Sequence, residues 1–350
     1  MPEAADGPPP AISVLMSLRN GAAHLPATLN SLADLRSPSG QIIEFVIVDD
    51  GSDDETPALL AGWVERDDRV RVLRRDTPTG LAAALNYGLE ACGAPLVARA
   101  DGDDLYHPDR LILQADAFTD NPDLGVLSCG YDRISDDDEL ISTVIPPTGP
   151  DILRFRMLFM NPILHPGVMF RTAVVRDVGG YDPAYWTAQD SDLWARLRDK
   201  TVIDNLPDSL VRYRVHSGSV MKTRGDAGQK LSRSVPERLQ TDYFGGELPY
   251  DVGSTVDLFQ GFKPLSADKV RAGINGLQDI YAIAKHRETP AVLVDFRRQV
   301  IGSMLKQAKW IKGKAPLAAL ALWRAALAFK MAGSATASTT SSPDRKVPQL

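Results

Sequence analysis

Two apolar runs in this chain end in clusters of acidic residues, and this pairing constrains the fold more than any other feature. Residues 43–48 lead into Asp49-Asp50-Gly51-Ser52, and residues 95–100 lead into Asp101-Gly102-Asp103-Asp104. Runs of this length that are rich in Val and Ile are typical of strands buried on both faces, as in parallel sheets covered by helices. Ligands of such sheets bind at the carboxyl ends of the strands. The sequence therefore predicts a parallel α/β sheet with an acidic ligand site at one edge.

Amphipathic segments alternate with apolar runs from Ile12 to about Val126, which indicates repeated βαβ units. Between about 124 and 220 the pattern is less regular, and we expect this region to build the second half of the same cleft. The strands are expected at 12–16, 42–48, 70–73, 95–100, 125–129 and 168–170. One helix is expected to contain Leu25, Leu29 and Leu32, and the next to contain Leu59, Leu60, Trp63 and Val64. Further helices are expected from Gly80, after Pro108, and at 172–178 and 190–198.

Composition divides the chain into five expected parts. The stretch Thr223–Arg233 is polar, Gly245-Gly246 follows it, and the tail is rich in Ser, Thr and Ala. We expect a disordered start at 1–10, an α/β domain at 11–222, a linker at 223–265, a helical region at 266–333 and a disordered tail at 334–350.

Charge and cysteine content exclude several classes of protein. The chain has 350 residues, a formal net charge of -6 and 44% hydrophobic residues. A general nucleic-acid binder needs a net basic surface, so no nucleic-acid partner is expected. Cys92 and Cys129 have no zinc or disulfide spacing and are expected to be reduced thiols. The first residues lack the features of a secretory signal, so we expect a cytoplasmic protein.

The second acidic cluster predicts a metal site. Because side chains alternate along an extended segment, Asp101 and Asp103 should point to one side, where two carboxylates can hold a hard divalent cation. Such a cation would face a polyanion, for example a diphosphate. A calcium-binding loop is the competing interpretation, but the Gly at position six and the Glu at position twelve are missing after Asp101.

Five sequence blocks, taken together and in this order, resemble the inverting family-2 glycosyltransferases. The blocks are 13–20, 48–52, 80–88, 101–104 and 189–194, and the resemblance spans roughly residues 11–220. It implies a GT-A fold, which is Rossmann-like with a mostly parallel central sheet flanked by helices, here followed by a helical C-terminal extension. The implied activity is transfer of a sugar from a nucleotide-activated donor.

The resemblance also implies the residues that bind the donor. An acidic side chain at Asp49 or Asp50 can accept a base N–H, which favours a UDP- or dTDP-sugar. The family's usual Pro-x-Tyr-Asn is replaced here by residues 17–20, where Arg19 could stack on the base or reach a phosphate. A simple turn with a helix cap at Ser52 or Asp53 is the alternative. The implied donor-binding residues are Ser17, Arg19, Asn20, Asp49, Asp50, Gly80, Asn86 and Asp101.

The same resemblance implies a metal and a catalytic base. Asp103 and His216 are expected to bind Mn²⁺ or Mg²⁺, which would stabilise the departing nucleoside diphosphate. Asp190 is expected to be the general base that deprotonates the acceptor hydroxyl on the face opposite the leaving group. The alternatives are that Asp190 and Asp192 only complement a helix N-terminus, and that His216 is structural.

A basic, aromatic-bearing segment near the C-terminus contrasts with the acidic whole. It suits helices that lie on an anionic membrane surface, although helices that merely pack on the rest of the protein are the alternative. Its longest uncharged run, 315–323, is too short to span a bilayer. Within 297–330, the part expected to bind membrane, the basic residues are Arg297, Arg298, Lys306, Lys309, Lys312, Lys314, Arg324 and Lys330.

These inferences predict an inverting glycosyltransferase that acts on a glycan or lipid-linked acceptor in cell-surface polysaccharide synthesis. One rival is a catalytically inactive nucleotide-sugar-binding protein. The other is a magnesium-binding receiver domain of a signalling protein, which leaves the blocks at Asp101 and Asp190 unexplained.

Overall fold

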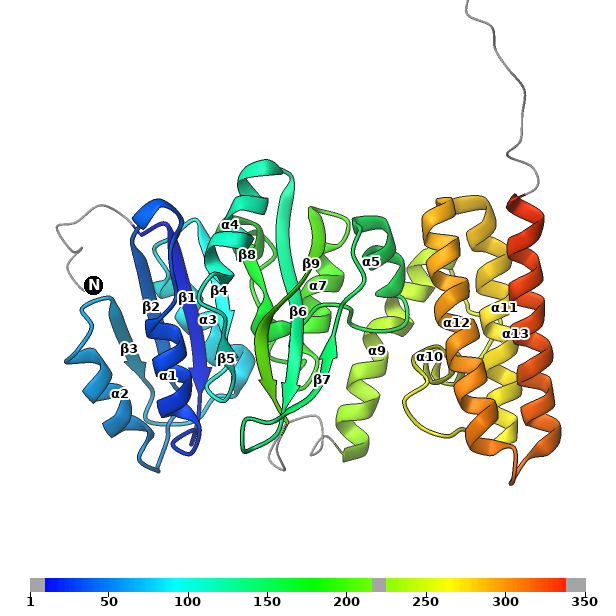
Figure 1. Cartoon of the computed structure of the whole chain (residues 1–350), viewed down its shortest axis with the longest axis horizontal. Helices are drawn as coiled ribbons and strands as arrows, with labels where there is room; N and C mark the ends of the chain where they lie inside the picture. The colour runs from blue at the N-terminus through cyan, green and yellow to red at the C-terminus, as the bar shows by residue number, and fades with distance from the viewer. Residues whose placement is uncertain (1–9, 216–224, 338–350) are drawn as a thin grey trace, which may run out of the picture. The chain divides into compact units, whose positions relative to one another are not determined.

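The computed structural model describes residues 10–215 and 225–337, and these form two compact units. The first unit holds the residues up to 154 and 161–235, and the second holds 155–160 and the residues from 236 on. Figure 1 shows a sheet with its helices in the first unit and a set of helices in the second.

The first unit is built on one sheet, to which nine strands of the described chain contribute. Its order is β3-β2-β1-β4-β8-β6-β9-β5, with β7 paired to β6. The strands β3, β2, β1 and β4 are parallel, β8 runs antiparallel to β4 and β6, and β6 is parallel to β9. The bounds are β1 Ile12–Leu18, β2 Ile43–Asp49, β3 Val70–Arg74, β4 Leu96–Ala100, β5 Leu105–Tyr106, β6 Leu124–Ile134, β7 Leu140–Val144, β8 Met169–Arg171 and β9 Val202–Arg214.

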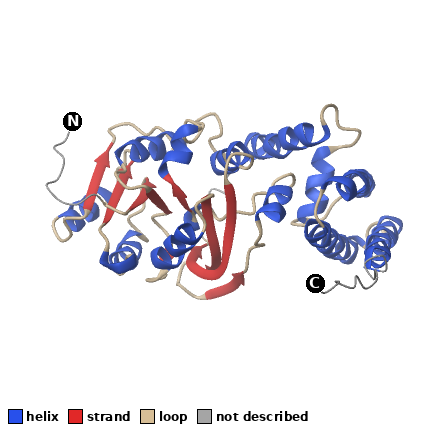
Figure 2. Ribbon diagram, turned by 90° about the horizontal axis from the view of Figure 1, so that it is seen from above, coloured by secondary structure: helices blue, strands red, loops and turns tan. Residues whose placement is uncertain are grey.

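Helices lie on both sides of this sheet (Figure 2). Alternate residues of β1, such as Val14 and Met16, share a hydrophobic cluster with α1, α2 and α4. On the opposite face α3 lies so close to the sheet that a Cβ at Gly88 would come within 2.4 Å of Leu15. The bounds are α1 Leu25–Ala33, α2 Thr56–Val64, α3 Leu81–Ala91, α4 Arg110–Asp120, α5 Pro150–Arg156, α6 Thr172–Asp177 and α7 Gln189–Leu197.

This architecture confirms the predicted fold class, a mostly parallel sheet flanked by helices with a helical C-terminal region. The predicted strands and helices of the first 120 residues are present at nearly the expected positions. In the less regular middle, β6 is longer than the pattern indicated, and β7 and β9 were not predicted. The start and most of the tail, which we expected to be disordered, lie outside the described residues.

The stretch 223–265 was expected to be a linker, but it contains two helices, α9 Gly225–Phe244 and α10 Val252–Gln260. In α10 the Asp251 carboxylate accepts a hydrogen bond from the Ser254 N–H, and Gly261 ends the helix with a φ of 62°. Buried Leu258 and Phe259 stabilise it. The sequence analysis missed these helices because it relied on the polar composition of the stretch. The domain limits themselves stay a prediction.

The second unit is held together by an aromatic cluster. The Phe159 and Phe259 rings stack with centroids 4.1 Å apart. An ion pair joins Arg156 Nε to Asp295 Oδ2 at 2.7 Å. The other helices are α11 Ala267–Arg287, α12 Pro290–Ile311 and α13 Pro316–Ala337, and the remaining clustered rings are Phe155, Tyr243, Tyr281, Phe296 and Phe329. Among the described residues, no helix is long and apolar enough to cross a membrane.

The buried thiols give a test of this packing. Burial raises the pKa of Cys92 to about 12 and that of Cys129 to about 11. Because the thiolate is the reactive form, we predict that a disulfide reagent at pH 8 labels neither cysteine in the native protein and labels both after denaturation. Rapid labelling of the native protein would contradict the packing around β6 and α3.

Candidate active site

The loops that follow β1 and β2 are joined by the side chain of Asn20. Its Nδ2 donates to Asp53 Oδ1 at 2.7 Å, its Oδ1 accepts from the Asp53 N–H at 3.0 Å, and its N–H donates to Ser52 Oγ at 2.9 Å. Asn20 has a φ of 54°, which Asn tolerates better than most residues. Asn20, one of the residues predicted to bind the sugar donor, therefore fixes the shape of both loops. Beside it Arg19 is exposed and Ser17 is buried.

Asp49 and Asp50 are both buried, but their carboxylates have different partners. Asp50 accepts hydrogen bonds from the N–H and hydroxyl of Thr79 and from the Gly80 N–H at 2.8 Å, so it fixes the start of α3. Gly80 has a φ of 87°, which favours glycine. Asp49 Oδ1 accepts from the Ser52 N–H, whereas its Oδ2 makes no hydrogen bond within the described chain and lies 3.5 Å from Arg74 Nη1. Asp49 therefore keeps an acceptor atom that a base N–H could use.

Asp101, Asp103 and Asp104 gather at the carboxyl end of β4. Each offers an oxygen, and these three atoms lie within 4.8 Å of one another. Asp104 is fully buried, its Oδ1 accepts from the Arg214 N–H at 2.8 Å, and its Oδ2 has no hydrogen-bond partner in the part of the chain described. Burial, with the charges of Asp103 and Asp101, raises the pKa of Asp104 well above its ordinary value. An orphaned buried oxygen in an all-oxygen cluster fits a hard divalent cation.

Two buried arginines support this cluster, and the sequence did not reveal either. Arg99 is fully buried and forms an ion pair with Asp101. Burial raises the pKa of Asp101, and Arg99 opposes this effect. Arg214 donates from Nε to the Asp103 carbonyl oxygen at 2.9 Å. The hydroxyl of Tyr106 accepts from the Asp101 N–H at 2.6 Å and completes the turn.

Asp190 lies in the first turn of α7. Its Oδ2 accepts from Asn161 Nδ2 at 2.7 Å, and its Oδ1 accepts from the Ser191 N–H at 2.8 Å. The charge of Asp190 also raises the pKa of Asp101, although its effect is smaller than that of burial or of the charges of Arg99 and Asp103. The Asp190 charge therefore acts on the acidic cluster in the same direction as the charge of Asp103.

One predicted donor-binding residue, Asn86, uses its side-chain amide within the protein, and the predicted metal ligand His216 is not placed. Asn86 forms hydrogen bonds to the backbone of Tyr181, donating to its carbonyl oxygen at 2.7 Å and accepting from its N–H at 2.8 Å. His216 lies outside the described residues. Another histidine, His165, is buried with Nε2 3.0 Å from the Tyr181 hydroxyl, and burial lowers its pKa well below the ordinary value.

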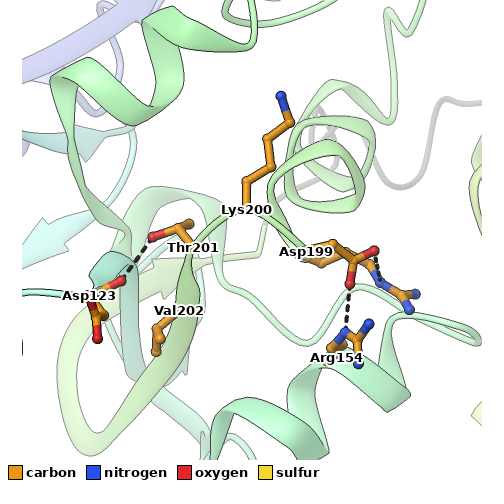
Figure 3. Close-up of a pocket in the computed structure, with 7 residues that line it drawn as sticks. Asp123, Arg154, Asp199, Lys200, Thr201 and Val202 are labelled. Atoms are coloured by element: carbon orange, nitrogen blue, oxygen red, sulfur yellow. Dashed lines mark hydrogen bonds and ion pairs between the residues drawn. The ribbon is translucent and has the colours of Figure 1, made fainter.

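A pocket of about 430 Å³ lies at the other end of α7 (Figure 3). Two of its arginines pair with Asp199, Arg154 through a contact of 2.6 Å from Nε to Oδ1 and Arg198 through a contact of 3.4 Å from Nε to Oδ2. It shares no residue with the acidic cluster and does not mark the donor site. The lining residues are Asp123, Arg154, Arg198, Asp199, Lys200, Thr201 and Val202.

Comparisons with known proteins agree with this arrangement. The sequence model described as "Glycosyl transferase family 2" matches residues 13–178. The amylovoran biosynthesis glycosyltransferase AmsE of Erwinia amylovora is 31% identical over 61% of this chain and 79% of its own length. The UDP-Gal:alpha-D-GlcNAc-diphosphoundecaprenol beta-1,3-galactosyltransferase of Escherichia coli is 31% identical over 54% of this chain and 68% of its own length.

Solved structures show the same fold at low sequence identity. S. aureus TarS 1-349, in a complex with UDP-GlcNAc, aligns with a TM-score of 0.54 at 16% identity, covering 94% of this chain and 92% of the 1-349 chain. The mannosyltransferase PcManGT of Pyrobaculum calidifontis, in a complex with GDP-Man and Mn²⁺, gives a TM-score of 0.53 at 16% identity, covering 97% and 92%.

The chain belongs to glycosyl transferase family 2 and has the GT-A fold. It is a nucleotide-sugar-dependent glycosyltransferase, and the cluster at Asp101, Asp103 and Asp104 is consistent with the DxD motif of such enzymes. The receiver-domain alternative is therefore wrong.

Removal of Asp103 tests the metal assignment. We predict that Asp103→Ala weakens Mn²⁺ binding, measured by calorimetry in the presence of UDP, at least about 10-fold, the loss typical even of outer-shell partners. Excess EDTA should abolish sugar transfer by the wild-type enzyme. The matched control is Asp116→Ala, which removes an exposed carboxylate on α4. Unchanged Mn²⁺ affinity in Asp103→Ala, or full activity in EDTA, would contradict the assignment.

Proposed function

We propose that this glycosyltransferase transfers a sugar, with inversion, from a UDP- or dTDP-sugar to a glycan or lipid-linked acceptor in cell-surface polysaccharide synthesis. The observation that supports the proposal is the cluster of three carboxylates at the carboxyl end of β4, together with Asp190, whose charge raises the pKa of Asp101. A base for the acceptor and carboxylates for the donor are the two requirements of a single displacement at the sugar carbon.

Each residue has a proposed task. Asp49 accepts the N–H of the nucleobase, because its Oδ2 is buried and makes no hydrogen bond to the described chain. Asp101, held by Arg99, contacts the ribose side of the donor. Asp190 removes the proton from the acceptor hydroxyl as its oxygen attacks the sugar. Asp103, with His216, would hold Mn²⁺ or Mg²⁺, and the cation would stabilise the charge that develops on the leaving diphosphate.

Exchange of the proposed base tests this mechanism. Asp190→Asn keeps the shape of the side chain but removes its basicity, so we predict that turnover falls by about 10²- to 10⁴-fold while donor affinity stays within a factor of about two. The measurements are single-turnover kinetics and equilibrium binding of the donor. Asp177→Asn, at an exposed site, is the control. Near-normal turnover in Asp190→Asn would count against the base, and donor hydrolysis without acceptor would exclude the inactive alternative.

We propose that the acceptor is lipid-linked and that the enzyme binds the cytoplasmic face of an anionic membrane through residues 297–330. The related Escherichia coli galactosyltransferase is named for an acceptor on diphosphoundecaprenol. The end of α12, the turn that follows it and the start of α13 carry two exposed large apolar side chains, Trp310 and Leu317, and four exposed lysines. These lysines are Lys306, Lys309, Lys312 and Lys314.

The outward side of α13 continues this surface. Trp323 is 58% exposed and Met331 is 63% exposed, whereas Leu322 and Phe329 face the interior. No Asp or Glu occurs from Phe296 to Lys330. Two copies of so basic a surface would repel each other, whereas anionic lipid head groups complement its charge and accept its apolar side chains.

Vesicle binding tests the surface without any substrate. Because each basic residue near an anionic surface contributes about 1 kcal/mol, replacing Lys309, Lys312 and Lys314 by Gln should weaken co-sedimentation with phosphatidylglycerol vesicles by roughly 100-fold. Binding by the wild-type protein should fall at high salt and be absent with phosphatidylcholine. A control with the same change of charge replaces Lys263, Lys269 and Lys285 by Gln. Failure of the wild-type protein to bind at low salt would assign these helices to packing or self-association.

A further inference from the structure

Asp190 receives a hydrogen bond from an amide that lies elsewhere in the chain, and we propose that this amide, on Asn161, positions the carboxylate for proton transfer, with Asn86 fixing the loop in front of it. The proposal rests on the role of Asp190 as the base. Asn161 Nδ2 lies 2.7 Å from Asp190 Oδ2. The two residues are far apart in sequence, and nothing in the sequence pattern links them.

The hydrogen-bond network fixes which end of the Asn161 amide faces Asp190. Its Oδ1 accepts from the Ile163 N–H at 3.0 Å, so the NH₂ group is the end that points to the carboxylate. The opposite orientation would set an amide oxygen against a carboxylate oxygen and would leave the Ile163 N–H without this acceptor. Because the Ile163 N–H occupies its oxygen, Asn161 donates to Asp190 through its NH₂ group.

The segment that carries Asn161 is anchored by two strands. Asn205, on β9, donates to the Pro162 carbonyl oxygen at 3.1 Å, and Ser128, on β6, donates to the Leu164 carbonyl oxygen at 2.9 Å. A donor mounted on a segment held in this way cannot follow the carboxylate if it rotates. The hydrogen bond therefore constrains Asp190 rather than the reverse.

A second donor holds the other oxygen of Asp190. The Ser191 N–H, at the start of α7, lies 2.8 Å from Oδ1. The terminal torsion of an aspartate is broad, so one hydrogen bond leaves the carboxylate plane free to turn, whereas two donors on different oxygens define it. The Ser191 hydroxyl also lies 3.5 Å from the same Oδ1.

The loop before α7 is fixed from α3. Asn86 uses both its donor and its acceptor on the Tyr181 backbone, at 2.7 and 2.8 Å. Gly180 has a φ of 71°, and a Cβ there would come within 2.5 Å of Asn86 Oδ1, so glycine is required for this approach. From α7, Arg196 donates to the Gly180 carbonyl oxygen at 2.7 Å. The loop is thus tied both to α3 and to the helix that begins with the base.

A double-mutant cycle tests Asn161. We expect Asn161→Ala to lower kcat by roughly 10- to 100-fold, the effect of one hydrogen bond to a charged group, with equilibrium donor affinity unchanged. In an Asp190→Asn background the same substitution should lower kcat less than about 2-fold, because the group that it positions is already inactive. A structural control is Thr172→Ala, which removes a buried hydrogen bond to the Ala94 carbonyl oxygen away from the Asn161 segment and should lower the melting temperature with little effect on kcat.

Other outcomes would overturn the proposal. Equal losses of kcat from Asn161→Ala in both backgrounds would show that Asn161 acts independently of Asp190, and a parallel loss of donor affinity would show general disruption of the site. Failure of the proposed function is distinguishable, because Asp190→Asn alone would then retain turnover.

The positioning role of Asn86 is tested by measuring donor binding and turnover separately in Asn86→Ala. Asn86→Ala should lower kcat while the equilibrium dissociation constant for UDP with Mn²⁺ changes less than about 2-fold, because its amide hydrogen-bonds the Tyr181 backbone. If donor affinity falls while kcat is kept, Asn86 binds the donor directly and its positioning role is wrong.

Discussion

The concentration of carboxylates at the carboxyl end of β4 is the constraint on which the rest of the site depends. Asp101, Asp103 and Asp104 place oxygens within 4.8 Å of one another, and Asp190 adds to their charge. Like charges this close, partly withdrawn from water, disfavour their ionised forms. The ion pair of buried Arg99 with Asp101 offsets part of this cost, and the Arg214 N–H donates a hydrogen bond to Asp104. A bound divalent cation would neutralise part of the remaining negative charge and so allow an anionic donor diphosphate to bind there.

The arginine that stabilises the acidic cluster is part of the sheet itself. Arg99 lies on β4, between buried Ala98 and Ala100, and is fully buried. An isolated buried cation would cost several kcal/mol, so its ion pair with Asp101 serves both partners. Arg214 comes from the end of β9, which reaches the site because β9 is parallel to β6 in the second half of the sheet. The first half of the sheet therefore supplies a cation to the acidic cluster, and the second half supplies hydrogen bonds from Arg214, whose guanidinium also pairs with Asp138 Oδ1 at 2.6 Å.

The sequence predicted the first half of the sheet well, because its strands are apolar runs separated by helices with clear periodicity. Asp49, Asp101 and Asp103 could be chosen because they follow such runs directly. The partners of these residues could not be found in this way. Arg99 looks like a break in an apolar strand, Asn161 precedes a proline in an irregular segment, and their contacts depend on strand order.

Long-range contacts also explain the other differences. The antiparallel strand β8 lies between β4 and β6, and no local pattern shows where a short strand will insert. The helices α9 and α10 are formed by sequences that look polar, yet Phe259 is buried in an aromatic cluster with Phe159 and Phe296. Residues 155–160 belong to the second unit for the same reason.

The stereochemistry of transfer tests the central claim most directly. If Asp190 deprotonates the acceptor on the face opposite the leaving diphosphate, one displacement must invert the sugar carbon. NMR of the anomeric proton, recorded on the first product formed from an α-linked UDP- or dTDP-sugar, should show a β-linkage. An α-linked product would contradict the account, because retention requires a different arrangement of groups around the sugar.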